Sequence, residues 1–271
     1  MSSNMYLSID VEDWFHSHNL WDGLDQDRWD EYELRVQHGT NRILDLLDAY
    51  DTKATFFVLG HVADRAPEVV AEIAARGHEI ASHGYNHRLL YEQEPEAVRE
   101  DIVRSVEKLE SITGQEVRGY RAPSFSITDW AIDILDDLGF EYDSSLFAAP
   151  VHDRYGGLSV DSTETFTEIR DGFTEVQLPL VDAKVTRIPW AGGGYFRVIP
   201  YRAYRHGLRR IARHRDCVFY LHPWELDPGQ PRVTDVKWQY RARHYTNIAR
   251  TERKFERLLS EFDWQPIGDR V

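Results

Sequence analysis

Residues 78–87 read HEIASHGYNH, a short strand-like run that ends in two histidines spaced four residues apart. A run of this length closed by a glycine is typical of a β-strand followed by a turn. Nearer the start, residues 5–13 read MYLSIDVED, where an apolar run ends in three carboxylates, Asp10, Glu12 and Asp13. Both segments therefore predict a strand with chemically active side chains directly after it.

The segments around these two continue the alternation. In the first half, strand-like runs and amphipathic stretches follow one another, which is typical of a parallel sheet with crossover helices. We expect strands within 53–60, 118–123 and 140–145, and helices over 41–50, 67–75, 95–112 and 129–138. The second half is less regular: the pattern predicts strands within 172–182 and 217–225, helices over 201–213 and 246–262, and a glycine-rich turn at 190–197. A single barrel-like α/β domain fits this order best.

The composition narrows the class of protein. The 271 residues are 42% apolar and 29% charged, which excludes a disordered chain, and no run of eighteen apolar residues could form a membrane-spanning helix. A net charge of −14 argues against nucleic acid or an anionic membrane surface as the main partner. Only five of the 32 basic residues are lysine, and acid-rich, lysine-poor surfaces resemble those of halophilic proteins. We therefore expect a halophilic protein, with an ordinary acidic enzyme as the alternative.

Two further features bear on the cellular setting. Residues 1–15, MSSNMYLSIDVEDWF, have neither the basic nor the apolar region of a secretory signal, so we expect a cytoplasmic location. Cys217 is the only cysteine, which excludes an internal disulfide. The sequence leaves a homo-oligomer open.

The polar residues after successive strands suggest a metal site, because active sites of parallel barrels lie at the carboxyl ends of the strands. Three carboxylates within four residues repel one another unless a positive group holds them, although a solvated acidic turn is the simpler reading. His83 and His87 could complete a site of two histidines and one carboxylate. Such a set suits Zn²⁺, and also Co²⁺, Mn²⁺ or Fe²⁺.

Five motifs then make the chain recognisable. They are SIDVED at 8–13, HEIASHGYNH at 78–87, RGYRAPSFS at 118–126, YDSS at 142–145 and FYLHPWE at 219–225. In this order they resemble the motifs of the polysaccharide deacetylases of carbohydrate esterase family 4, the NodB-homology domain. The closing part further resembles a subgroup that carries a C-terminal extension and accompanies exopolysaccharide and exosortase systems.

The resemblance implies a fold and a reaction. The fold would be a distorted (β/α) barrel of about seven parallel strands, formed by one domain over residues 1–271, with 226–271 as an extension packed on the barrel. The reaction would be the metal-dependent hydrolysis of an N-acetyl or O-acetyl group on a sugar.

The resemblance also assigns roles to single residues. Asp10 would be the general base, Arg121 would orient it, and His222 would be the general acid. His83, His87 and one acidic neighbour would hold the divalent metal, for which Zn²⁺ is the first choice.

The metal carboxylate is the point at which the chain departs from the family. The family has two adjacent aspartates, whereas Val11 and Glu12 separate Asp10 from Asp13 here. Side chains alternate along a strand, and Asp13 has the same odd offset from Asp10 as the family's ligand. We therefore favour Asp13, and Glu12 is the alternative.

Five residues are expected to bind the substrate. Trp190 and Tyr195 could stack on a sugar ring, although a turn packed in the core explains them equally well. Trp224 stands beside His222 in the closing motif. Pro123 and Ser145 belong to family motifs and are expected to line the groove.

The sequence therefore predicts a metal-dependent deacetylase that acts on acetylated amino sugars of a cell-surface polysaccharide or its precursor. Two alternatives remain. One is a small-molecule amidohydrolase, either allantoinase-like or a sugar deformylase, and the other is a sugar-binding barrel without catalysis. Retention of His83 and His87 argues against the metal-free, allantoinase-like branch.

Overall fold

The computed structural model describes residues 3–147, 155–160, 162–183 and 186–271. Among the described residues, no helix is both long enough and apolar enough to cross a membrane.

The strands form one large sheet and one small one. Their bounds are β1 Met5–Val11, β2 Thr55–Val58, β3 Glu79–Ser82, β4 Gly119–Tyr120, β5 Tyr142–Asp143, β6 Phe166–Arg170, β7 Phe173–Val176, β8 Leu180–Ala183, β9 Thr186–Pro189, β10 Cys217–Leu221 and β11 Trp264–Gln265. In the described part, the large sheet has the order β10-β1-β2-β3-β4-β5-β7-β6, and β11 pairs with the start of β1. All its pairs are parallel except β6 with β7, and β8 pairs with β9 separately.

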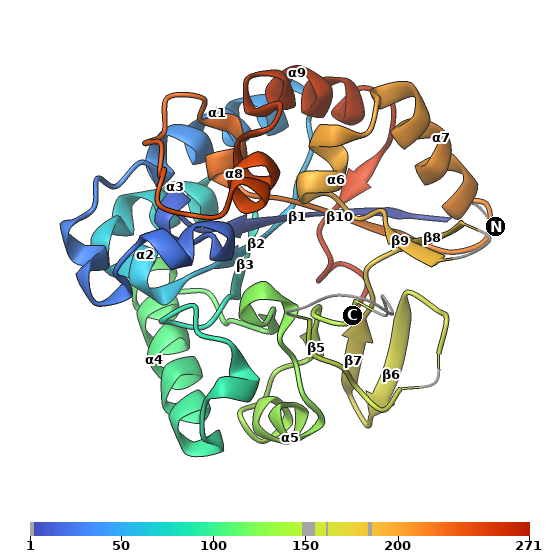
Figure 1. Cartoon of the computed structure of the whole chain (residues 1–271). Coiled ribbons are helices and arrows are strands. Elements are labelled where there is room, and N and C mark those ends of the chain that lie inside the picture. Colours follow the sequence, from blue (N-terminus) through green and yellow to red (C-terminus); the bar gives the residue numbers. More distant parts are fainter. Residues whose placement is uncertain (1–2, 148–154, 161, 184–185) are drawn as a thin grey trace.

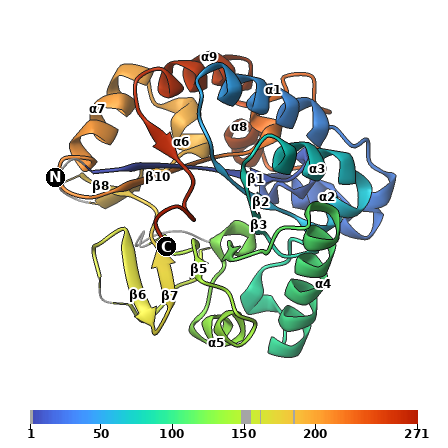
Figure 2. The ribbon, with the colours of Figure 1, turned by 180° about the vertical axis from the view of Figure 1, so that it is seen from behind.

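The helices surround this curled sheet (Figures 1 and 2). The α-helices are α1 Val36–Ala49, α2 Gly60–Arg65, α3 Pro67–Ala75, α4 Pro95–Thr113, α5 Asp129–Asp137, α6 Gly193–Val198, α7 Tyr201–Ile211, α8 Trp238–Tyr245 and α9 Ile248–Leu259. Short 3₁₀ helices are η1 Trp14–His16, η2 His18–Gly23, η3 Gln26–Glu31, η4 Leu90–Glu92, η5 Pro123–Phe125 and η6 Pro223–Leu226. The half-barrel of mostly parallel strands confirms the predicted fold class.

Strand alternation decides what reaches the site. On β1, Leu7 and Ile9 belong to the large core that packs the sheet against the helices. Tyr6 belongs to a second cluster on the opposite face of the sheet, together with Phe57 of β2. Because side chains alternate along a strand, Asp10 shares the face of Tyr6 and points away from the helices. The carboxyl end of β1 therefore delivers an acid to the inner face of the half-barrel.

The C-terminal part packs on the barrel. β11 pairs with β1, and α9 lies beside α1, where Arg42 and Glu252 form an ion pair of 2.7 Å (Figures 1 and 2). Two expectations differ from the structure here. The segment 190–197 is not simply a turn, because α6 begins at Gly193, and α8 has no counterpart in the prediction.

Candidate metal and acid–base site

Asp10 is held by a buried arginine. Arg121 follows β4, and its Nη1 donates to Asp10 Oδ1 at 2.6 Å and to the Ser8 hydroxyl at 2.8 Å. Its Nε donates to the Ser144 carbonyl oxygen at 2.8 Å. Burial alone would raise the pKa of Asp10, but the charges of Arg121 and of the nearby histidines, together with the hydrogen bond from Arg121, outweigh it, and the pKa lies below its usual value. Asp10 is therefore an ionised, fixed carboxylate.

Glu12, His83 and His87 form a group that could hold a metal ion. Each can offer one ligand atom, and these atoms all lie within 4.8 Å of one another in a buried place. His83 Nδ1 is 2.8 Å from the carbonyl oxygen of Arg121, so this nitrogen must be the donor. Its Nε2 is then left with a lone pair, which is the arrangement found in metal-ligating histidines.

Burial and missing partners show that these residues fit a cation. Glu12 Oε2 and His87 Nδ1 are buried and make no hydrogen bond to any described residue. His87 Nε2 lies 3.3 Å from Glu12 Oε2. Burial lowers the pKa of both His83 and His87 to about 4, so both imidazoles are neutral at pH 7, as metal ligands must be. Two neutral imidazoles and one carboxylate suit Zn²⁺ and related divalent ions.

The carboxylate of Asp13, the metal ligand favoured from the sequence, caps η1 in the structure. β1 ends at Val11, and Asp13 caps η1, so strand alternation no longer sets its direction. Its carboxylate accepts backbone N–H groups from Trp14 at 2.7 Å, Arg35 at 2.5 Å and Val36 at 2.7 Å. Burial nevertheless raises its pKa to about 6. Asp13 therefore fixes the loop after β1, and Glu12 takes the position beside the histidines.

His222 lies between two carboxylates. It follows β10, and its Nδ1 is 2.7 Å from Glu225 Oε1, while its Nε2 is 3.0 Å from Glu12 Oε1 and 3.9 Å from Asp10 Oδ2. Burial alone would lower the pKa of His222, but Glu12 and Glu225 raise it to about 10. His222 is therefore a protonated imidazole close to Asp10.

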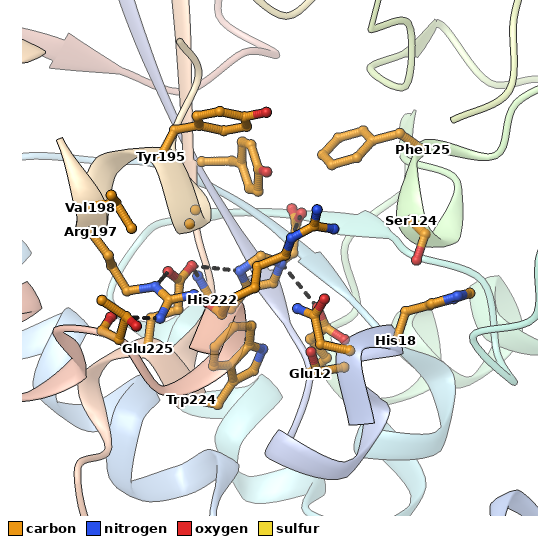
Figure 3. A pocket seen from close by; sticks show the side chains of 18 of the residues that line it. Glu12, His18, Ser124, Phe125, Tyr195, Arg197, Val198, His222, Trp224 and Glu225 are labelled. Carbon is orange, nitrogen blue, oxygen red and sulfur yellow. Dashed lines mark hydrogen bonds and ion pairs between the residues drawn. The ribbon is translucent and has the colours of Figure 1, made fainter. Parts of the chain in front are cut away.

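A pocket of about 540 Å³ opens over these groups. Figure 3 shows Glu12, His222 and Trp224 in it, with Tyr195 and Phe125 on the opposite side. The wall has aromatic residues and residues of α6 and α8; it includes Tyr155, Tyr195, Val198, Ile199, Tyr220, Trp224, Ala242, Arg243 and Thr246. Such a cavity, with a polar floor and mostly apolar walls, is typical of a small-molecule or sugar site.

The loop after β4 contributes backbone to the pocket. Ser124 and Phe125 both line it and have positive φ values of 51° and 60°, which are unusual for residues with a side chain. The Ser124 N–H makes no hydrogen bond within the described residues, whereas the Phe125 N–H donates to Ala122 O at 2.9 Å. This amide therefore belongs to a segment that lines the same pocket as the metal-binding group.

The structure places only some of the residues expected to bind substrate in the described pocket wall. Tyr195 and Trp224 line the pocket, whereas the described lining does not include Pro123, Ser145 or Trp190. Pro123 is buried behind Ser124. The Ser145 hydroxyl donates to Asp143 Oδ1 at 2.6 Å and accepts from the Ala122 N–H at 2.8 Å. A part of these three residues in substrate binding therefore stays a prediction.

Trp190 has a structural explanation. Its ring stacks on Tyr204 at 5.4 Å, and its Nε1 donates to the Tyr204 carbonyl oxygen at 2.9 Å. A Cβ added to Gly207 would lie 2.4 Å from the indole, so α7 packs closely on this ring. Trp190 thus belongs to the packing between α7 and the sheet.

Sequence reasoning missed Arg197 and the wall from α8. Arg197 lies in the glycine-rich segment, and no periodic pattern there indicates which side chains are buried. The basic and aromatic residues of α8 give no apolar stripe of helical spacing, so their contact with the pocket has no simple signal in the sequence.

Two family matches divide the chain. Residues 27–142 match the polysaccharide deacetylase family, and residues 144–271 match a domain of unknown function designated DUF3473. The second match begins directly after β5 and includes His222, so it is longer than the extension expected over 226–271.

Curated and solved relatives agree with the first match. A peptidoglycan deacetylase of Helicobacter pylori is 26% identical over 218 residues, covering 79% of this chain and 70% of the relative. A chitooligosaccharide deacetylase of Rhizobium leguminosarum bv. trifolii is 37% identical over 103 residues, covering 36% of this chain and 44% of the relative. The solved structure of a candidate polysaccharide deacetylase from Mycobacterium smegmatis matches with a TM-score of 0.63 and 23% identity, over 97% of this chain and 86% of that one. The chain therefore carries a polysaccharide deacetylase domain of the NodB type, carbohydrate esterase family 4.

Proposed function

We propose that the protein is a metal-dependent deacetylase that removes an N-acetyl group, or an O-acetyl group, from an amino sugar of a cell-surface polysaccharide or its precursor. One observation carries the proposal: the Asp10–Arg121 pair, the Glu12–His83–His87 group and His222 meet at the floor of one pocket. The names of the relatives, which act on peptidoglycan and chitooligosaccharides, support the same substrate class.

A divalent ion held by Glu12, His83 and His87 would supply Lewis-acid chemistry, polarising the acetyl carbonyl and lowering the pKa of a water. Asp10 then has the role of general base, because Arg121 keeps its carboxylate ionised and oriented for accepting a proton from that water. The Ser124 N–H is a backbone donor for the negative charge that develops on the carbonyl oxygen.

His222 has the role of general acid. It lies on the far side of Asp10 from Arg121, with 3.9 Å between its Nε2 and Asp10 Oδ2, and it is protonated at neutral pH. A protonated imidazole can deliver its proton to the amine nitrogen as the C–N bond breaks. The products are acetate and the free amino sugar.

Product identity tests the proposal. The protein, with metal restored, is incubated with N-acetylated chitooligosaccharides, peptidoglycan fragments, acetylated nucleotide sugars and small ureides or formylated sugars, in low and high salt. We expect acetate from at least one acetylated sugar. Ammonia or formate from the small substrates would instead indicate an amidohydrolase. A protein that binds no added metal and forms no product would indicate a non-catalytic barrel.

A further inference from the structure

A buried arginine stands behind the histidine of the site. Arg197 of α6 is only 1% exposed, and its Nε donates to Glu225 Oε2 at 2.6 Å. The other oxygen of Glu225 accepts from His222 Nδ1 at 2.7 Å, and Glu225 itself is fully buried. Figure 3 shows Arg197, Glu225 and His222 in series along one side of the pocket. Both carboxylate oxygens of Glu225 are therefore hydrogen-bonded.

The remaining donors of Arg197 are fixed by the end of α8. Its Nη2 donates to the carbonyl oxygen of Arg243 at 2.8 Å, and its Nη1 donates to the carbonyl oxygens of His244 and Thr246. The last carbonyl groups of a helix have no partner inside the helix, and they favour a cation. The guanidinium thus links the end of α8 to the carboxylate that holds His222.

These contacts constrain the imidazole. Because Glu225 Oε1 accepts a hydrogen bond from His222 Nδ1, the opposite nitrogen, Nε2, is directed at the pocket. Glu225 is buried, so without Arg197 its Oε2 would lose the donor that it has here, which is costly and would drive the carboxylate to rotate or take up a proton. A lysine could not replace Arg197, because one ammonium cannot reach a carboxylate and three carbonyl groups in this fork geometry.

We propose that Arg197 is a positioning residue for the reaction: it fixes Glu225, and through it the orientation and hydrogen-bonded state of His222. This gives the matched domain of unknown function, residues 144–271, a part in the chemistry, since it supplies Arg197, Glu225 and His222 and the α8 carbonyl groups together. The inference rests on the proposed function for its kinetic consequence, but the hydrogen bond itself can be observed without turnover.

The first readout is nuclear magnetic resonance of the imidazole. Protein labelled with ¹⁵N-histidine is examined with metal restored, and the His222 signal is assigned by its loss in His222→Gln. In the wild type we expect a strongly hydrogen-bonded Nδ1 proton, and in Arg197→Met we expect this signal to shift or disappear. An unchanged signal in folded Arg197→Met would overturn the proposal.

The second readout separates kcat from KM for acetate release. Arg197→Met should lower kcat by about 10–100-fold, the range typical of residues that orient an active group, with KM and bound metal nearly unchanged. Arg205→Met is the matched control, because Arg205 of α7 also pairs with a glutamate, Glu261 at 3.0 Å, away from the pocket. A rise in KM at constant kcat would make Arg197 a substrate-binding residue and overturn the proposal.

Glu225→Gln keeps the test decisive if Arg197→Met does not fold. The glutamine has the same size and removes the charge, so kcat should fall to a similar extent, and the double variant should lose little more because both changes act on one contact. An unchanged kcat in folded Glu225→Gln contradicts the proposal. If wild-type protein releases no acetate from any probe, the proposed function fails, and the resonance experiment still decides whether Arg197 positions His222.

Discussion

Glu12 and Asp13 are neighbours with opposite environments, and this difference gives a direct test at the scale of the residue. Glu12 has a buried oxygen without a hydrogen bond and lies with two neutral histidines, whereas Asp13 accepts three backbone N–H groups. We expect Glu12→Gln to lose most of the bound metal after dialysis, because three protein ligands become two. Asp13→Asn should keep the metal, although it should lower stability through the weakened cap.

Elemental analysis of the dialysed proteins gives the answer, with the melting temperature as a check on folding. Metal lost only from Asp13→Asn would show that Asp13 turns toward the histidines when the ion binds, and it would restore the expectation drawn from the sequence.

His222 is predicted to act on the substrate rather than on the metal. His222→Ala should lower kcat for acetate release by about 10²–10⁴-fold, which is the usual contribution of a general acid, with bound metal unchanged. The measurement pairs steady-state kinetics with metal analysis on the same sample. Loss of the metal from this variant would move His222 into the coordination shell and contradict its assigned role.

At the scale of the element, two buried acids join β5 to β7. Asp143 and Glu175 are register partners and are both fully buried. Burial raises the pKa of Asp143 to about 6, and burial together with the nearby Asp143 charge raises the pKa of Glu175 well above its usual value. In the unfolded chain both would ionise near their ordinary pKa values of 3.8 and 4.5. Above those values this pair therefore holds more protons in the folded protein than in the unfolded chain.

A pH dependence of stability follows from this excess of protons. The contribution of this pair to the free energy of unfolding should fall as pH rises from about 5 through 6 and beyond, with a slope that approaches about 1.4 kcal/mol per pH unit for one extra proton. In Glu175→Gln the side-chain amide does not titrate and can still donate to Asp143. The fall in the free energy of unfolding over the same pH range should therefore be smaller. Denaturant unfolding of both proteins at several pH values measures the two slopes, and equal slopes would contradict the extra proton assigned to this pair.

The elements also show what the sequence could predict. The spacing of apolar residues and the positions of Pro and Gly predict α3 with its observed bounds, and α4 and α5 to within a residue. They do not predict α6, because Gly192–Gly194 has no helical pattern, nor α8, whose exposed Trp238 and arginines have no apolar stripe.

The site, like the helices, could be predicted from the sequence only in part. The motifs and the rule that strand ends carry chemistry led to Asp10, His83, His87, Arg121 and His222, which the structure brings together around the pocket. Asp13 could not be placed by strand alternation, because the chain leaves the strand at Val11 and a backbone cap takes over its carboxylate. Long-range pairing, such as Arg197 with Glu225, has no local pattern at all.

At the scale of the whole molecule, the net charge of −14 gives a prediction about salt. Like charges on a compact chain repel one another, and salt screens this repulsion. We propose that the protein is adapted to high salt, and we expect its melting temperature to rise steadily from dilute buffer to molar KCl. A melting temperature that stays constant over this range would show that the acidic composition is not an adaptation to high salt.

The central claim is that a metal ion and Asp10 together make the pocket a deacetylase. The most direct measurement is acetate released from an acetylated amino-sugar oligomer by wild-type protein and by Asp10→Asn, each metal-loaded, then treated with chelator, then reloaded. We predict that wild type releases acetate, stops after chelation and recovers on reloading, while Asp10→Asn binds the metal but releases almost none. Acetate release that survives complete metal removal, or that is unaffected by Asp10→Asn, would contradict the account.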